Sequence, residues 1–176
     1  MNNPTWDLLI IIFAIVAVVF GVAMGRERSM VSVIASYLGL VVANFWGNAV
    51  YALLGGQSTA QVGSAVAFSA TASPFFIKAG IFIIIIVLLI IKGDFLKRAI
   101  TSHAGIGSIV TSAVYSALNA GLIIMALTSF LGDSQRTSLL EQSKIINMIT
   151  QYQTWLVVLP VAIMIFLGFR DKDEIQ

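Results

Sequence analysis

The chain has 176 residues, of which 59% are apolar and only 10% are charged, and its mean hydropathy is +0.97. A soluble domain needs about a quarter of its residues charged, so this composition excludes an ordinary soluble protein. The net charge of +2 and the lack of a basic cluster with interleaved aromatics argue against nucleic acid as a partner, and the absence of cysteine excludes disulfides. We therefore expect the chain to lie in a lipid bilayer.

Apolar stretches long enough for membrane helices occur five times along the chain. A helix needs about 20 apolar residues to cross a hydrocarbon core of about 30 Å. The stretches cover residues 8–25, 30–54, 75–91, 106–131 and 155–169. The last is short and contains Pro160, which a membrane helix tolerates when its neighbours satisfy the freed backbone. We predict an all-α bundle, a single transmembrane domain over residues 1–176, with five spans, or four if the last stretch is interfacial.

The first two stretches carry small residues at every fourth position. They are Ala17, Gly21 and Gly25 in the first stretch, and Ala35, Gly39, Ala43 and Gly47 in the second. Residues four apart share one helix face, and small side chains there let helices approach closely in lipid. These residues are also simply common in membrane helices. Asp7 lies at the start of the first stretch, where a helix N-terminus favours an anion.

Residues 55–74 connect the second and third stretches and contain no charged side chain. This composition is typical of a flexible external loop, and it also permits a short helix over residues 60–72 on or in the membrane face. The third stretch is rich in bulky Ile, Leu and Val on every side. We therefore expect it to lie at the rim of the bundle and to face lipid.

The fourth stretch has two adjacent ladders of small residues. One consists of Ser108, Ser112, Ser116 and Ala120, and the other of Ala113, Ala117 and Gly121. We expect the first, second and fourth helices to form a tight central layer. Asn44 and Asn119 are amides within spans. Each is consistent with an interhelical hydrogen bond worth about 1 kcal/mol, or with the lining of a polar path beside Ser112 and Ser116.

The segment before the last stretch contains a helix-start pattern. Ser138-Leu139-Leu140-Glu141 has the spacing of a capping box, and apolar residues recur at rough helical spacing after it. We predict an amphipathic helix over residues 138–152 at the outer interface, leading into the last span.

Lysine and arginine are distributed unevenly between the two sides of a five-span bundle. One side has Arg26, Arg28, Lys92, Lys97, Arg98, Arg170 and Lys172, and the other has Lys78, Arg136 and Lys144. The richer side faces the cytoplasm, so we predict an external N-terminus and a cytoplasmic C-terminus. An interfacial last stretch would remove this bias, so the charge pattern favours five spans.

The sequence contains no pattern that predicts a catalytic, cofactor or metal site. All charged residues lie at helix ends or in connections, which argues against a proton-coupled transporter. His103 is the only histidine and has no acidic or cysteine neighbour, whereas a metal centre needs three or four ligands. No serine lies in a nucleophile elbow and no Gly-rich phosphate loop is present. We predict that the protein is not an enzyme and has no cofactor.

Several of these residues resemble the colicin V production protein (CvpA) family. The similarity to the N-terminal half of that family lies in Asp7 before an apolar helix, followed by Gly21-x-x-x-Gly25-Arg26-x-Arg28. The segment 138–144, together with the glycine-rich opening of the fourth stretch, resembles later parts of that family. Residues 102–104 depart from it, because Ser-His-Ala stands where the family commonly has an Asp-Arg pair.

The resemblance implies a multi-pass protein of the bacterial inner membrane with a role in colicin or toxin export or envelope homeostasis. Family members are usually described with four spans. We expect such a protein to act through the lipid bilayer and through other membrane proteins or copies of itself. The alternatives are a pore or transporter subunit with a polar path near Asn44 and Asn119, and a small holin-like lytic protein.

Overall fold

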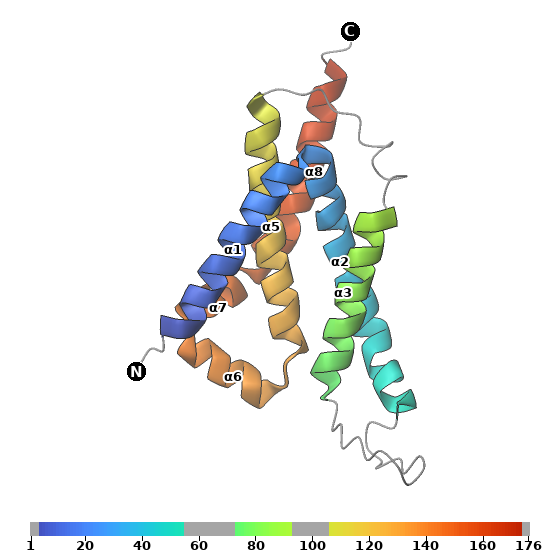
Figure 1. Ribbon diagram of the computed structural model, residues 1–176, viewed down its shortest axis with the longest axis vertical. Helices are drawn as coiled ribbons and strands as arrows, with labels where there is room; N and C mark the ends of the chain where they lie inside the picture. Colours follow the sequence, from blue (N-terminus) through green and yellow to red (C-terminus); the bar gives the residue numbers. More distant parts are fainter. Residues whose placement is uncertain (1–3, 55–72, 93–105, 174–176) are drawn as a thin grey trace.

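The structure, a computed structural model, describes residues 4–54, 73–92 and 106–173 (Figure 1). Side chains are described within residues 6–54, 73–92 and 109–166. These segments form seven helices and contain no strand, which confirms the all-α fold class. The helices are α1 (Pro4–Met24), α2 (Arg26–Leu53), α3 (Pro74–Lys92), α5 (Ile106–Phe130), α6 (Asp133–Gln142), α7 (Lys144–Gln151) and α8 (Gln153–Asp173).

Four of these helices, α1, α2, α3 and α5, are long and apolar enough to cross a membrane. The pair α7 and α8 is bent by 63° at its break and adds a fifth crossing only if the two helices form one span. In Figure 1 the N-terminus, α6 and α7 lie at one end of the molecule, and the C-terminus lies at the other. This architecture is compatible with a multi-pass membrane protein.

Helix α5 packs against α1 and α2, and α8 also packs on α5. We predicted that the third span lies at the rim of the bundle, and this holds for only part of α3. Helices α2 and α3 run side by side in Figure 1 and form the most extensive helix pair. Ala79 and Phe82 of α3 are buried against this neighbour, while Ile83, Ile84 and Leu88 are exposed. The reason is that one narrow face of α3 fits the small residues of α2.

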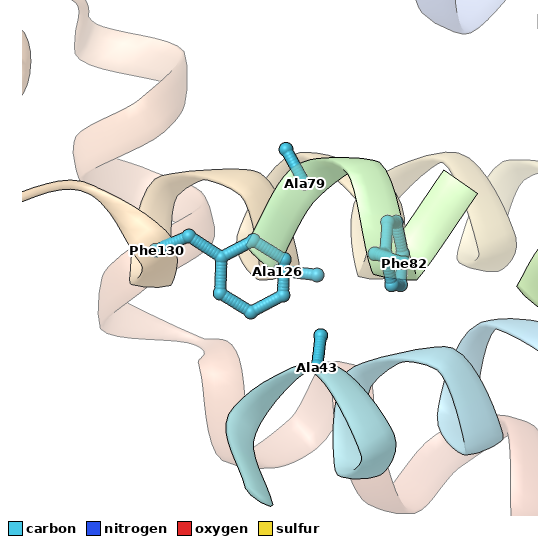
Figure 2. Close-up of a cluster of buried hydrophobic side chains, with 5 residues drawn as sticks. All are labelled: Ala43, Ala79, Phe82, Ala126 and Phe130. Atoms are coloured by element: carbon cyan, nitrogen blue, oxygen red, sulfur yellow. The ribbon is translucent and has the colours of Figure 1, made fainter. Parts of the chain in front are cut away.

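A cluster of buried apolar residues joins α2, α3 and α5 (Figure 2). It consists of Ala43, Ala79, Phe82, Ala126 and Phe130. The rings of Phe82 and Phe130 meet edge to face with centroids 5.8 Å apart. A Cβ at Gly39 would lie 3.0 Å from the Phe82 ring, so the absent side chain leaves the space that the ring needs. The small face of α2 therefore accommodates an aromatic side chain of α3.

The single helix predicted over residues 138–152 is wrong, because two helices occupy this region. Helix α6 begins at Asp133 after Gly132, so Ser138 lies inside it and does not open it. The helical structure is interrupted at Ser143. The Ser143 hydroxyl accepts a hydrogen bond from the Ile146 backbone N–H at 3.1 Å. A serine that caps a following helix takes an extended backbone conformation, which ends the preceding helix.

Some predictions fall outside the described residues. The short helix predicted over residues 60–72 lies outside the described residues, and so does the external loop predicted over residues 55–74, except for Ser73 and for Pro74, which begins α3. Residues 93–105, which include His103, also lie outside them. The side chains of Ser108, Arg170 and Lys172 are also outside the described part.

Candidate functional site

Gly21 of α1 lies where three helices meet. The hydroxyl of Ser112 on α5 donates to the Gly21 carbonyl oxygen at 2.7 Å, and Ser29 Oγ on α2 lies 3.0 Å from the same oxygen. The Ser29 and Ser112 hydroxyls are themselves 3.0 Å apart, and Ser116 Oγ lies 3.3 Å from Ser29 Oγ. All three serines are buried. Hydrogen bonds between side chains and a backbone carbonyl thus hold α1, α2 and α5 together.

Further polar side chains continue from this point along the contact between α2 and α5. The Asn119 amide donates to Ser32 Oγ at 2.7 Å. We define the polar seam as Ser29, Ser32 and Ser36 of α2 with Ser112, Tyr115, Ser116 and Asn119 of α5. The positions on α2 are three or four residues apart, and on α5 the pairs Ser112–Ser116 and Tyr115–Asn119 are each four residues apart, so the seam lies along one side of each helix. Of the interhelical hydrogen bonds that we considered for Asn44 and Asn119, the seam contains the one made by Asn119.

Three buried atoms of the polar seam have no hydrogen-bond partner within the described part of the chain. They are Ser36 Oγ, Tyr115 OH and Asn119 Oδ1. A buried polar group without a partner costs about 1 to 3 kcal/mol, and ordered water commonly satisfies such groups. Bound water would satisfy these three atoms.

Asn44 does not belong to the polar seam. Ala43 is fully buried, and Asn44 follows it by one residue, about 100° around the helix. Asn44 is therefore exposed on the outer surface of α2 and makes no hydrogen bond to the described residues. Asn44 and Asn119 therefore do not line one polar path within the described part of the chain.

The other small residues fall into different environments. Close contacts occur at Gly47, whose missing side chain leaves room for the Lys78 stem of α3, and at Gly121, which faces Leu156 of α8. Ala35 and Ala120 are buried, and Ala17, Ala113 and Gly121 are half-buried.

Two residues of the predicted ladders do not pack between helices. A Cβ at Gly25 would meet nothing within 4 Å, and its φ of 86° shows that it makes the turn between α1 and α2. Ala117 is exposed, because the adjacent ladder through Ser116 faces the bundle. Arg26 is half-buried and Arg28 is exposed in the first turn of α2.

Asp7 contacts a segment that is far away in sequence. Its Oδ1 accepts a hydrogen bond from Ser143 Oγ at 2.5 Å and one from the Ile145 backbone N–H at 3.4 Å. The carboxylate therefore links the start of α1 to the N-terminus of α7, where exposed N–H groups favour an anion. Sequence reasoning assigned Asp7 to its own helix. No signal in the sequence indicated this partner, because Ser143 lay inside the single helix predicted over residues 138–152.

We expect Ser143→Ala to lower the free energy of unfolding by about 1 kcal/mol, because the α7 cap is lost. Ser143 is fully buried, whereas Ser138 of α6 is exposed, so Ser138→Ala is the control and is expected to have little effect. Denaturant titration of the purified protein in detergent measures both. Asp7→Asn should lower the free energy of unfolding more when it is made in the native protein than when it is made in the Ser143→Ala variant. Purely additive effects would contradict the link.

A cavity of about 630 Å³ lies beside the start of α1, the start of α3, the end of α5 and α6. One wall is apolar and includes Trp6, Phe75 and Leu127, and the α6 wall includes Ser134 and Gln135. No charged side chain lines it among the described residues, and none of the residues of α6 is buried. Sequence reasoning missed this cavity because it placed no helix over residues 133–137.

Known proteins do not identify this site. The chain matches no family model, no curated protein and no solved structure. Among the described residues, no group of three or more His, Asp or Glu side chains could hold a metal ion. The resemblance to CvpA therefore stays a prediction.

Proposed function

We propose that the protein is a non-enzymatic, multi-pass protein of the bacterial inner membrane that acts by binding partner proteins within the bilayer. In this proposal α7 and α8 form one broken fifth span. The N-terminus then lies outside and the C-terminus lies in the cytoplasm, in agreement with the distribution of Lys and Arg.

The observation that carries this proposal is the exposed amide of Asn44 within a candidate span. Hydrocarbon offers no hydrogen-bond partner, so a polar side chain within a span normally faces protein or a water-filled cavity. The neighbouring Phe45 is 79% exposed and Trp46 is 64% exposed. A polar group surrounded by large exposed apolar side chains is typical of a surface that contacts another protein.

A role in colicin or toxin export or in envelope homeostasis follows from the resemblance to CvpA. The segments that carry the resemblance also meet in the structure, where Asp7 accepts a hydrogen bond from Ser143. Those segments are far apart in sequence and lie at the same end of the bundle.

Photo-cross-linking in bacterial membranes tests partner binding. A photoreactive phenylalanine analogue at Phe45 is expected to form protein adducts, whereas the same analogue at Ile83, which is exposed on α3, should label mainly lipid. Adducts are detected as bands of increased mass on denaturing gels. Equal labelling of protein from both positions, or none from position 45, would contradict the proposal.

A second candidate function is a pore along the polar seam, favoured by its three buried atoms without partners. It predicts ion flux in reconstituted vesicles that Asn119→Leu abolishes. Asn44→Leu is the control and should leave the flux unchanged, because Asn44 lies outside the seam. Vesicles without flux would exclude this candidate.

A further inference from the structure

One face of α2 is exposed along the C-terminal half of the helix. Val41, Asn44, Asn48 and Ala52 are all exposed. They are spaced by three or four residues and therefore lie on one face of the helix, which we call the α2 stripe. At the other end of this face the Tyr37 hydroxyl donates to the Val157 carbonyl of α8. Helix α8 thus contacts this face near Tyr37, and the α2 stripe is the part that remains exposed.

In the orientation proposed above, the position of Asn44 along α2 lies inside the hydrocarbon. Arg28 is the last charged residue of α2, and about 20 helical residues cross the core, so the core ends near residue 49. Asn44 then lies about 8 Å inside the outer boundary, at a rise of about 1.5 Å per residue. The Lys78 stem contacts Gly47 at this level, as expected for a lysine that extends its ammonium group to the interface.

The chemistry of the amide favours one kind of partner. A carboxamide has both donors and an acceptor, so two identical amides can exchange hydrogen bonds and satisfy each other. Copies of one membrane protein insert in the same orientation, and their equivalent residues therefore lie at the same depth. A two-fold axis along the membrane normal brings each residue of the α2 stripe near its own counterpart.

We propose that the α2 stripe binds the α2 stripe of a second copy of this chain, with the two Asn44 amides hydrogen-bonded across the two-fold axis. This inference rests on the proposed function and names the partner at the same surface. Ala52 is small enough to let the helices approach closely on one side of the amides. Phe45 lies at the edge of the contact.

The chain contains no cysteine, so single-cysteine variants allow a direct test. Val41→Cys, Asn48→Cys and Ala52→Cys are oxidised in membranes and compared with Ile83→Cys on the exposed face of α3. We expect a product of twice the chain mass from the three α2 positions and little from position 83. Equal dimer yields at all four positions would overturn the inference.

Substitution of the amide itself gives the second measurement. In the Val41→Cys protein, Asn44→Leu should weaken self-association about tenfold, as expected for the loss of one amide contact in a membrane, and Asn44→Gln should retain it. Both variants should elute as folded protein on size exclusion, because Asn44 is exposed and has no hydrogen bond to the described residues to lose. Unchanged dimerisation in Asn44→Leu would overturn the inference.

The outcomes separate this inference from the proposed function. If residue 45 forms adducts with another protein while no α2 cysteine gives a dimer, partner binding stands and the second copy is excluded. If residue 45 forms no protein adduct and the α2 cysteines give no dimer, both are excluded.

Discussion

Replacing Gly21 with alanine is expected to separate α1 from α5 and to lower the free energy of unfolding by about 3 kcal/mol. The added Cβ would lie 1.6 Å from Ser116 Oγ and 2.4 Å from Ser116 Cβ. Rotation of the serine hydroxyl relieves the first contact and leaves the second, because Cβ is fixed by the backbone. Helix α1 therefore has to move, and the Ser29 and Ser112 hydroxyls lose the Gly21 carbonyl.

Gly80 of α3 provides a matched control for this substitution. A Cβ at this position would meet nothing within 4 Å, and the residue lies inside a helix. Gly80→Ala should therefore stabilise the protein by about 0.5 to 1 kcal/mol, since alanine favours the helix. Unfolding by titration with a denaturing detergent, followed by circular dichroism, measures both variants. Adding Ser116→Gly to Gly21→Ala should recover part of the loss. Equal stability of the two alanine variants would contradict the contact.

The long helices could be predicted from sequence because their length and hydropathy are local properties of the chain. The positions at which helices contact each other were harder to predict from the sequence. Spacing by four identified a smooth face on α2, but it did not identify which helix fills it. Gly39 and Gly47 face α3 through Phe82 and Lys78, whereas Gly21 faces α5.

Polar residues show the same limit. The sequence pattern predicts that Asn44 and Asn119 both lie within spans, but the rotation of each helix about its axis in the bundle decides what they contact. Asn119 faces α2 and forms a hydrogen bond with Ser32, while Asn44 points outward. The contact of Asp7 with Ser143 depends on the break between α6 and α7. A capping pattern at Ser138 obscured that break, because its spacing is also found inside helices.

Replacing Phe82 with alanine is expected to lower the free energy of unfolding by about 2 kcal/mol. Phe82 is 1% exposed and packs edge to face on Phe130 above Gly39. In a soluble core the same change costs about 3 to 5 kcal/mol, and part of that is the transfer of the ring from water. A membrane helix that separates from the bundle exposes its rings to lipid, so mainly the cavity and the lost packing contribute.

Ile83 is the matched control, because it follows Phe82 on the same helix and is 54% exposed. Ile83→Ala creates no cavity between helices and should change the free energy of unfolding by less than about 0.5 kcal/mol. The same detergent titration compares the two variants. Phe82→Leu should lose less than Phe82→Ala, since a leucine fills part of the space above Gly39. If Phe82→Ala is no less stable than Ile83→Ala, the α2–α3–α5 cluster does not hold α3 in the bundle, and the exposed face of α3 has to be assigned again.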